Sequence, residues 1–305
     1  RTKLEDFKPY HTLGKGKFGK VVSAQKQRAS GEPEWVAVKE IICKKPNDVK
    51  VVLRERMIME RIALSPSPFA TQMKFASLVG SKIYFAMDFV EGGDLFTILQ
   101  NHSISYSGAR LYAAEILEAL KYLHSLNIVY RDLKPENILV SGNGHLKLAD
   151  FGLSRIVDEG DDVCYTVCGT AAYFAPELLC SNQGYGLSVD YWQFGCFVYE
   201  LFVGESPFYD RQRSLAATNM MIKKGEFEFP TGGSRRWKQI VSELLVPAIP
   251  GRCGFKEGQK GWGAVAQQPF FDKLDWSHVQ NLKYSPPVRP LCAGEDYTKN
   301  FDEQF

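Results

Sequence analysis

Apolar and polar positions alternate along the first 42 residues, and glycines and turn-forming residues interrupt the alternation. The stretches KVVSAQKQ (20–27) and EWVAVKEII (34–42) have the spacing of strands, and RASGEP between them is typical of a turn. Residues 48–64 are rich in Leu, Met, Ile, Arg and Glu, which predicts a helix that ends at SPSP. KIYFAMDFV (82–90) predicts a further strand. We therefore expect the first third of the chain to be a twisted antiparallel sheet with one helix.

Helical spacing dominates after EGGDLF (91–96), whose two glycines lie at the change of pattern and predict a hinge. Residues 107–125 place Leu111, Ala114 and Leu117 on one helical face. Residues 188–203 predict a second helix that is apolar nearly all round. The tail, 284–305, contains three prolines, so we expect it to be extended and to wrap a surface.

Composition narrows the class of protein. The 305 residues are 45% hydrophobic and 24% charged, with a net charge of +2, which suits one large domain or two lobes. So balanced a charge gives no support for nucleic-acid binding or for direct membrane contact. The longest apolar stretch, Tyr191 to Val203, contains Glu200 and is too short to span a bilayer, so it predicts a core helix. No signal peptide is visible, and the chain begins at Arg1, as a fragment of a longer protein would.

The seven cysteines are scattered without paired spacing. A zinc site needs about four converging ligands, and no His/Cys cluster supplies them. This distribution favours reduced thiols in a cytoplasmic or nuclear protein over zinc or a disulfide framework.

A glycine-rich segment, LGKGKFGKV (13–21), could approach phosphate oxygens closely, because Gly14, Gly16 and Gly19 leave backbone N–H groups uncovered. The pattern is weak by itself, and a strand–turn–strand that needs positive φ angles would also explain it. Strands are predicted on both sides and no helix follows. This context argues against a dinucleotide site of the strand–loop–helix type.

Lys39 lies inside the apolar strand VAVKE. Such a lysine is commonly a snorkelling or edge residue, and it acquires chemical interest only with a carboxylate opposite. Glu55, on the following predicted helix, could pair with it and hold the ammonium near bound phosphates. The alternative for Glu55 is a solvated helix charge like its neighbour Glu60.

Charged and amide residues are concentrated between apolar flanks in VYRDLKPENILV (129–140). Asp132 and Asn137 come from this segment, and Asp150 follows in LADFG (148–152). Two carboxylates and an amide on adjacent loops can bind Mg²⁺ through oxygen and orient a hydroxyl group. With a cation for the phosphates, they make up the groups that phosphoryl transfer requires.

Taken in order, the glycine loop, Lys39, RDLKPEN, DFG and APE (175–177) resemble the catalytic domain of a eukaryotic protein kinase. The resemblance covers nearly the whole chain. It implies an α+β, bilobal fold with a small antiparallel β-sheet lobe (1–90), a hinge (91–95), a larger helical lobe (96–280) and part of a C-terminal tail (281–305). ATP is then expected in the cleft near the hinge.

The resemblance also implies catalytic roles, which are those of the general phosphoryl-transfer template. Lys39 would hold the α- and β-phosphates and pair with Glu55. Asp132 would orient the substrate hydroxyl and accept its proton. Lys134 would steady the γ-phosphate.

The implied cofactors are ATP and Mg²⁺, and Asn137 and Asp150 would hold the metal. Met87 would guard the rear of the adenine pocket. The residues implied to bind ATP are Leu13, Gly14, Gly16, Gly19, Val21, Ala37, Lys39, Met87, Asp88, Phe89, Asp94, Leu139, Ala149 and Phe301.

Finer motifs resemble the AGC group of serine/threonine kinases, typified by protein kinases A, G and C. DLKPEN is similar to the serine/threonine branch, and GGDLF, TVCGT and the tail NFDEQF are similar to protein kinase C-like and ribosomal S6 kinase-like members. In that group the tail wraps the small lobe, so Phe301 would approach the adenine. Glu177 would pair with Arg252, and Asp190 would anchor the catalytic loop.

The same resemblance implies an activation site and a substrate class. An upstream activating kinase would phosphorylate Thr166, and the phosphate would pair with Arg131 and Arg155. The implied substrates are proteins with a serine or threonine in an arginine-rich context, because carboxylates favour guanidinium groups a few residues before the acceptor. The implied substrate-binding residues are Asp94, Glu136, Thr170 and Glu200.

Two segments depart from the group. GTAAY lacks the usual Pro-Glu after Gly-Thr, and VPAIPGRCGF replaces an Asp-Pro…Arg-Leu-Gly run. Both lie on the substrate side or in the packing of the large lobe. The main alternative to an active enzyme is a pseudokinase that binds nucleotide as a scaffold, but such proteins usually lack Lys39, Asp132 or Asp150. A small-molecule kinase is disfavoured by TVCGTAAYFAPE, which resembles a peptide-binding platform.

Overall fold

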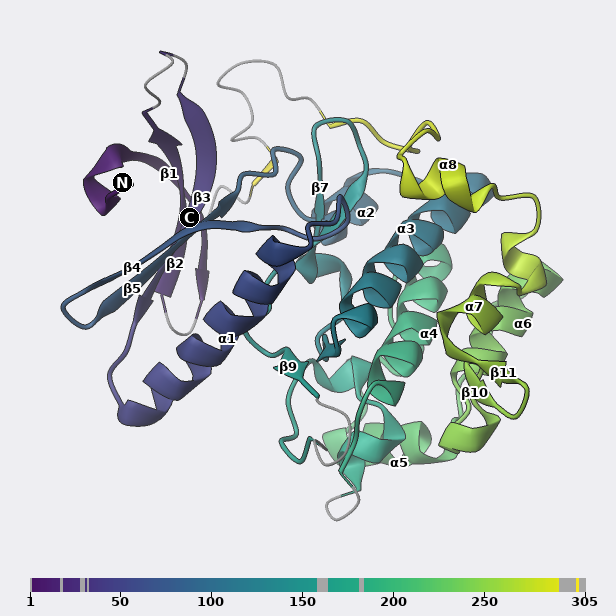
Figure 1. Ribbon diagram of the computed structural model, residues 1–305. Helices are drawn as coiled ribbons and strands as arrows, with labels where there is room; N and C mark the ends of the chain where they lie inside the picture. Colours follow the sequence, from purple (N-terminus) through teal and green to yellow (C-terminus); the bar gives the residue numbers. More distant parts are fainter. Residues whose placement is uncertain are drawn as a thin grey trace.

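The computed structural model describes residues 2–16, 19–27, 31, 33–157, 164–180, 184–290 and 300–301. A five-stranded antiparallel sheet with strand order β1-β2-β3-β5-β4 forms the smaller lobe (Figure 1). Its elements are η1 (Leu4–Asp6), β1 (Phe7–Gly16), β2 (Gly19–Lys26), β3 (Glu34–Ile42), α1 (Pro46–Leu64), β4 (Met73–Val79) and β5 (Lys82–Asp88). The predicted strands and helix are confirmed, and β4 is an additional strand that the sequence pattern did not predict.

Helices make up most of the larger lobe. Its helices are α2 (Leu95–Asn101), α3 (Tyr106–Ser125), η2 (Pro135–Asn137), η3 (Ala171–Tyr173), η4 (Pro176–Leu179), α4 (Ser188–Val203), α5 (Leu215–Lys224), α6 (Arg235–Leu244), η5 (Ile249–Gly251), α7 (Gly261–Ala266), η6 (Pro269–Phe271) and α8 (Trp276–Gln280). Its short strands are β6 (Ile128–Val129), β7 (Ile138–Val140), β8 (Leu146–Leu148), β9 (Arg155–Ile156), β10 (Phe255–Lys256) and β11 (Gln259–Lys260). The α+β, bilobal architecture is therefore confirmed.

Helix α4 forms the centre of the larger lobe, with α3 and α6 packed against it. Its residues from Ser188 to Leu201 are all buried, as its apolar sequence predicts. It ends at Gly204, whose left-handed φ of 89° permits the chain to turn away. No helix of the described residues combines the length and the apolarity that a membrane crossing requires.

Residues 284–290, after α8, have no regular secondary structure, and the extended conformation of the tail stays a prediction. This segment lies close to glycines of the larger lobe. A Cβ atom at Gly144, where φ is +89°, would lie 2.2 Å from the carbonyl oxygen of Val288, and one at Gly108 would lie 2.5 Å from Pro287. The tail thus packs against backbone where a side chain would exclude it. Residues 291–299 and 302–305, including most of the NFDEQF motif, lie outside the described residues.

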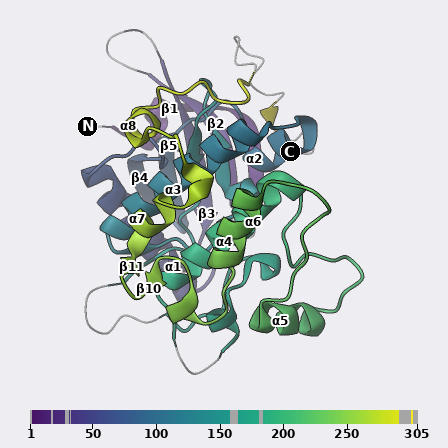
Figure 2. The ribbon, with the colours of Figure 1, turned by 90° about the vertical axis from the view of Figure 1, so that its right-hand side faces the viewer.

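Helix α5 lies at the end of the larger lobe that is remote from β1 in both ribbon views (Figure 2). Its neighbour is η4. There the predicted pair of Glu177 and Arg252 is present, with Nη1 of Arg252 2.7 Å from Oε1 of Glu177 and Nη2 2.9 Å from Oε2. The Arg252 side chain is completely buried and also lies over the ring of Trp192. This ion pair therefore joins η4 to the segment after α6 inside the core.

We expect Glu177→Gln to lower the free energy of unfolding by about 3–5 kcal/mol, because it leaves the charge of Arg252 buried without its carboxylate. Urea unfolding followed by circular dichroism measures the change. The matched control is Glu226→Gln, which removes the exposed Lys224–Glu226 pair and is expected to cost about 0–1 kcal/mol. Equal effects of the two variants would contradict a structural role for the buried pair.

Candidate functional site

A cavity of about 260 Å³ lies between the two lobes. Phe301 of the tail lines it together with residues of the sheet, of the connection to α2, and of β7 and the segment after β8. The predicted ATP-binding residues found in its lining are Leu13, Gly14, Val21, Ala37, Lys39, Met87, Asp88, Phe89, Asp94, Leu139, Ala149 and Phe301. Further lining residues that the sequence analysis did not single out are Met59, Thr71, Val90 and Phe151. Phe151 lies in the DFG motif, which could have indicated it, whereas neither the type nor the spacing of the other three marks them as site residues.

The two other predicted glycines, Gly16 and Gly19, pair with each other at the end of the β1–β2 hairpin and do not line the cavity. None of the three loop glycines has a positive φ angle, so the conformational explanation for them is wrong. Gly19 is required by packing, since a Cβ atom there would lie 1.7 Å from the carbonyl oxygen of Glu40. A Cβ atom at Gly14 or Gly16 would meet nothing within 4 Å. The fold of these residues therefore leaves the backbone open at Gly14 and Gly16 without needing glycine for its own packing.

Lys39 lies at the meeting point of three elements. Its Nζ is 2.7 Å from Oε1 of Glu55 on α1 and 2.9 Å from Oδ1 of Asp150, in the segment after β8. Glu55 is only 4% exposed and shares the inner face of α1 with Val52 and Met59, so its interpretation as a solvated helix charge is wrong. Glu60, in contrast, pairs with Arg56 on the outer face.

Electrostatics keep this group charged. Burial by itself would lower the pKa of Lys39, but the carboxylates of Asp150 and Glu55 raise it above its ordinary value. Partial removal from water would raise the pKa of Asp150, and the ammonium of Lys39 outweighs that effect and lowers it. Burial raises the pKa of Glu55, and the attraction of Lys39 offsets this only in part. The cavity therefore contains a cation whose charge is supported most clearly by the carboxylate of Asp150.

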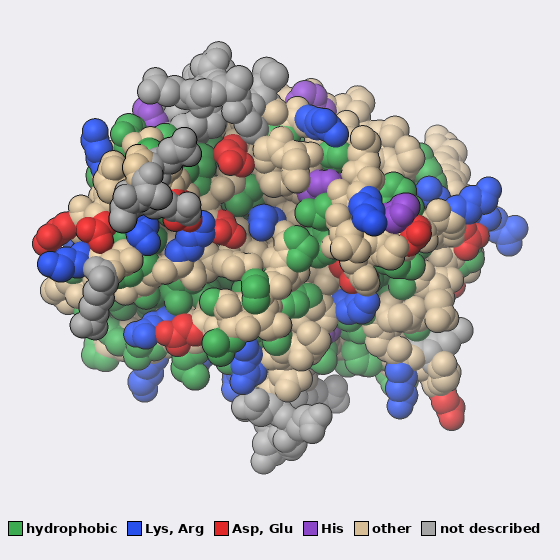
Figure 3. All heavy atoms as spheres, turned by 45° about the horizontal axis from the view of Figure 1, so that its top comes forward, with side chains coloured by type: hydrophobic (Ala, Val, Ile, Leu, Met, Phe, Trp, Pro, Cys, Tyr) green, Lys and Arg blue, Asp and Glu red, His purple; other side chains and the backbone are tan. Residues whose placement is uncertain are grey.

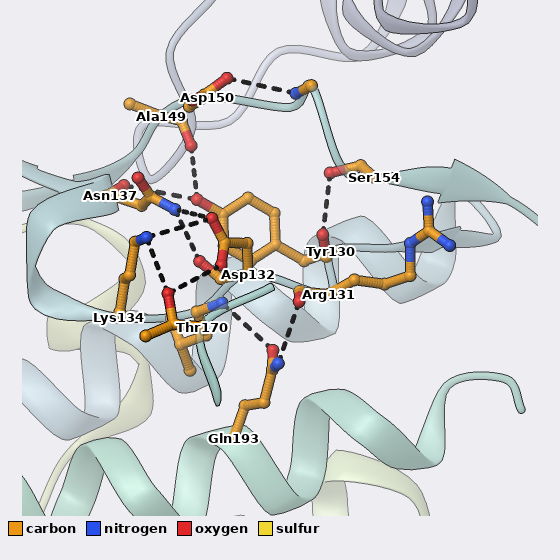
Figure 4. A network of polar contacts seen from close by, with 12 residues as sticks. Tyr130, Arg131, Asp132, Lys134, Asn137, Ala149, Asp150, Ser154, Thr170 and Gln193 are labelled. Atoms are coloured by element: carbon orange, nitrogen blue, oxygen red, sulfur yellow. Dashed lines mark hydrogen bonds and ion pairs between the residues drawn. The ribbon is translucent and has the colours of Figure 1, made fainter. Parts of the chain in front are cut away.

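A second polar network lies on the floor of the cleft, in the larger lobe (Figure 4). The Nδ2 atom of Asn137 donates to Oδ2 of Asp132 at 2.6 Å and to the Asp132 carbonyl at 2.8 Å. Nζ of Lys134 donates to Oγ1 of Thr170 at 2.9 Å and lies 3.5 Å from Oδ2 of Asp132. Thr170 Oγ1 in turn lies 3.5 Å from Oδ1 of Asp132. An ammonium, an amide and a hydroxyl group thus converge around the carboxylate of Asp132.

Buried side chains of α4 hold this loop in place. The carboxylate of Asp190 accepts hydrogen bonds from the backbone N–H groups of Tyr130 (2.9 Å) and Arg131 (2.8 Å), and it also contacts Nε2 of His124 at 2.7 Å. Gln193, one helical turn later, donates to the Arg131 carbonyl and accepts from the backbone N–H of Leu133. Arg131 has a φ of 71°, which is unfavourable for a residue with a side chain and needs such support.

The anchoring role expected of Asp190 is confirmed. Gln193 was missed by the sequence analysis, because a single glutamine in an apolar helix carries no motif. Its position three residues after Asp190, on the same helical face, is the only signal that could have indicated it.

The two loops of the site are joined directly. The hydroxyl group of Tyr130 donates to the carbonyl oxygen of Ala149, next to Asp150 (Figure 4). The ring of Tyr130 packs edge-on against Phe151, with a centroid distance of 5.8 Å. Tyr130 therefore fixes the segment that carries Asp150 relative to the segment that carries Asp132.

The side-chain oxygens of the site are suited to coordinate an Mg²⁺ ion that is also coordinated by phosphates. Asn137 uses its amide nitrogen toward Asp132, which leaves its side-chain oxygen on the opposite side of the planar amide. Asp150 contributes a carboxylate at the cavity wall. Among the described residues, no cluster of three or more His, Cys, Asp or Glu side chains could hold a metal ion alone. Mg²⁺ typically takes one or two protein oxygens and completes its shell with phosphates and water, so this donor set is appropriate.

The carboxylates expected to contact substrate have different surroundings. Asp94 is the N-cap of α2 and accepts from the Thr97 N–H at 2.8 Å, while Glu136 is exposed on η2. Glu200, on α4, is 8% exposed and accepts a hydrogen bond from the hydroxyl of Tyr173. Burial raises the pKa of Glu200 to about 7, and the nearby carboxylates of Glu136 and Glu205 act in the same direction.

Thr166 is exposed in the segment between β9 and η3. Its carbonyl oxygen accepts a hydrogen bond from the hydroxyl of Tyr185, which itself accepts one from Nη1 of Arg131 at 3.1 Å. The Nε of Arg131 donates to the carbonyl oxygen of Leu153. One of the two arginines expected to pair with a phosphate on Thr166 is thus connected to Thr166 through a single tyrosine.

Surface charge agrees with the balanced composition. Basic and acidic side chains are interspersed over the face shown in Figure 3, without a large area of one sign. This face gives no indication of a polyanion-binding surface.

Comparison with known proteins gives a consistent result. Residues 7–268 match the protein kinase domain family. The chain is 36% identical over 303 residues to Serine/threonine-protein kinase YPK1 of Saccharomyces cerevisiae, covering 99% of this chain and 43% of that protein. It is 37% identical over 306 residues to Serine/threonine-protein kinase Sgk3 of Rattus norvegicus, covering 99% of this chain and 60% of that protein.

A third similar protein is Ribosomal protein S6 kinase 2 alpha of Xenopus laevis, 35% identical over 303 residues, or 98% of this chain and 40% of that protein. The chain thus spans between two fifths and three fifths of the length of these three relatives. All three relatives are kinases of the AGC group, as the sequence motifs predicted. On the match of residues 7–268, the two-lobed fold and these relatives, the chain belongs to the protein kinase domain family.

Proposed function

We propose that this chain transfers the γ-phosphoryl group of Mg·ATP to serine and threonine hydroxyls of proteins. The observation that carries the proposal is the convergence, at one cavity, of the Lys39–Glu55–Asp150 ion pairs with the Asp132–Lys134–Asn137 network. The first supplies a fixed cation and the second a group that can receive a proton. Catalysis of phosphoryl transfer consists mainly of such positioning and charge stabilisation.

Each network has a defined part in this proposal. Lys39 holds the nucleotide phosphates, and Glu55 restrains the lysine so that little reorganisation is needed when phosphate enters. Asp132 accepts a hydrogen bond from the substrate hydroxyl and takes its proton, while Lys134 steadies the transferred group. Asn137 and Asp150 would hold Mg²⁺, which would neutralise phosphate charge when bound.

The adenine is proposed to lie between apolar walls of the two lobes. Val21 and Ala37 come from the sheet, and Leu139 comes from β7. Phe89 and Phe301 are stacked with centroids 6.1 Å apart, so the tail forms one edge of the pocket. The pseudokinase alternative is not favoured, because Lys39, Asp132 and Asp150 are all present. Lys39 is paired with Asp150, and Asp132 is held by Asn137 and Lys134.

The proposed substrates have arginine before the acceptor residue. Glu136 belongs to η2, directly before Asn137 of the catalytic network, and Glu200 is near enough for its pKa to be raised by Glu136. These carboxylates are proposed to receive guanidinium groups a few residues before the hydroxyl. An upstream protein kinase is proposed to phosphorylate Thr166, where Arg131 and Arg155 would receive the phosphate.

Replacing Asp132 by Asn is expected to reduce kcat about 10²- to 10⁴-fold, because the amide cannot accept the hydroxyl proton. Nucleotide binding should remain, since Asp132 is not in the apolar lining of the cavity. The measurement is phosphate transfer from Mg·ATP to an arrayed peptide library, with nucleotide binding followed by calorimetry. Undiminished transfer in this variant would remove Asp132 from the proposed mechanism. Binding of ATP without transfer by the unaltered chain phosphorylated at Thr166 would favour the scaffold function.

Lys39→Met is expected to lower kcat/KM for ATP about 10²- to 10³-fold, because it removes the cation aimed at the phosphates. A matched control exists in the same sheet: Lys82 pairs with Glu40 at 3.1 Å between β5 and β3 but lies outside the cavity. Lys82→Met should leave kcat/KM within about twofold. Equal losses in the two variants would indicate a general effect on the sheet.

The pKa of Glu200 near 7 predicts that substrate recognition depends on pH. The carboxylate is charged above its pKa and neutral below it, so attraction for arginine weakens as the pH falls. KM for an arginine-containing peptide should therefore rise up to about tenfold between pH 8 and pH 6, because the charged fraction falls from about nine tenths to about one tenth. Glu200→Gln should give a high KM that no longer changes with pH. A KM that rises with pH would contradict the assignment.

A further inference from the structure

A surface loop of the chain contains an arginine followed by a serine. This is the pattern expected of a substrate if Glu136 and Glu200 bind arginine, as proposed above. Ser214 follows Arg211-Gln212-Arg213 and precedes Leu215. It is the only serine or threonine in the 305-residue sequence with an arginine three residues before it. Arg211, Ser214 and Leu215 are all exposed. The acceptor and its recognition element are therefore accessible together.

The loop is anchored at one end and held weakly at the other. Residues 204–214 connect α4 to α5, and Phe208 fixes the loop to the core by stacking on Trp192 at 5.5 Å. Beyond Phe208 the contacts lie on the surface: Nε of Arg211 contacts the Tyr209 hydroxyl, and Arg213 pairs with Asp210 at 3.1 Å. Exposed pairs of this kind contribute little to stability. Both arginines can thus exchange these partners for carboxylates of a cleft.

We propose that Ser214 is a phosphorylation site, and that a second copy of this chain phosphorylates it. The inference rests on the proposed function, because it requires the kinase activity and its preference for arginine before the acceptor. In the acting copy, Glu136 and Glu200 receive the arginines and Asp132 receives the hydroxyl. The two copies meet transiently, as enzyme and protein substrate.

The geometry requires a second copy. The Oγ of Ser214 caps α5 by accepting a hydrogen bond from the Ala217 N–H at 3.3 Å. Helix α5 packs on η4 within the larger lobe, at the end remote from the sheet that forms one wall of the cavity (Figures 1 and 2). Ser214 could reach the cleft of its own chain only if α5 unfolded. Presentation to another copy needs the exposed turn at residues 210–213 to open and the cap of Ser214 on the first turn of α5 to be released, while the rest of α5 stays folded.

The proposed kinase activity supplies every reactant that phosphorylation of Ser214 requires. A bond forms between Oγ of Ser214 and the γ-phosphorus of ATP, and the bond from that phosphorus to the β,γ-bridging oxygen breaks. ADP leaves with the bonding electron pair, and the hydroxyl proton passes to Asp132 of the acting copy. The product is compatible with the fold, since a phosphate at the first turn of α5 meets unpaired backbone N–H groups and the positive end of the helix dipole.

The test uses the full chain carrying Asp132→Asn as substrate and the unaltered chain as enzyme, with Mg·ATP. Phosphate on the substrate chain is located and quantified by mass spectrometry of its peptides. We expect phosphate on Ser214, at an initial rate proportional to the concentration of substrate chain. Arg211→Ala in the substrate chain should lower that rate about tenfold or more, because it removes a charge-assisted contact.

Two variants separate loss of the acceptor from loss of the helix cap. Ser214→Asn keeps a capping side chain and removes the hydroxyl, so labelling here should disappear while activity on an arginine-containing peptide stays unchanged. Ser234 is the matched control, because it is also a serine N-cap, accepting from the Arg236 N–H of α6, but is followed, not preceded, by arginines. Ser234→Asn should leave the labelling of Ser214 unchanged.

The outcomes are distinguishable. Transfer to an arginine-containing peptide without phosphate on Ser214 would overturn this inference and leave the proposed function intact. Labelling of Ser214 that Arg211→Ala does not slow would overturn the recognition on which the inference depends. No transfer to peptide or to chain would instead overturn the proposed function.

Discussion

The buried carboxylate of Asp190 is the interaction on which the rest of the site depends. It is completely inaccessible, and its two oxygens are shared among two backbone N–H groups and a ring nitrogen of His124. A carboxylate removed from water so completely is tolerated only when its lone pairs are used in this way. The consequence is a loop whose backbone is held by several hydrogen bonds, including Arg131 at an unfavourable φ. Gln193 adds two further contacts from the same helix, so α4 acts as a rigid support for Asp132.

The smaller lobe contributes the positive charge of the site, the ammonium of Lys39. Residues that are far from Lys39 in the sequence hold this ammonium in place. Lys39 and Asp150 are 111 residues apart in the chain and 2.9 Å apart in space. Glu55 holds the same ammonium from α1, so the sheet, the helix and the segment after β8 meet at one cation. Because Tyr130 bonds to the carbonyl next to Asp150, the cation is also connected to the loop supported by Asp190. Contacts within the chain therefore position the two halves of the site relative to each other.

The prediction from sequence was most complete where motif and periodicity agreed. The alternation in β3 placed Lys39 in a strand, and the helical spacing of α1 was sufficient to propose Glu55 but not to decide which way it faces. The neighbouring Glu60 has the same chemistry, and only the burial of Val52 and Met59 beside Glu55 distinguishes the two. The three loop glycines show the opposite case: one motif contains Gly19, which strand packing requires, and Gly14 and Gly16, which packing does not require. A sequence motif does not separate these causes.

The sequence by itself determined the kinds of chemical groups, their order and the elements that carry them, because these follow from local pattern and from motifs of a few residues. It identified Asp132, Asn137 and Asp150, and it indicated that α4 is buried. Only the tertiary structure decided which groups share a hydrogen bond. Gln193 with the catalytic loop, Tyr130 with Ala149 and Tyr173 with Glu200 are contacts between distant segments. Such contacts depend on how the elements pack, and side-chain periodicity specifies the face that packs but not the partner that it meets.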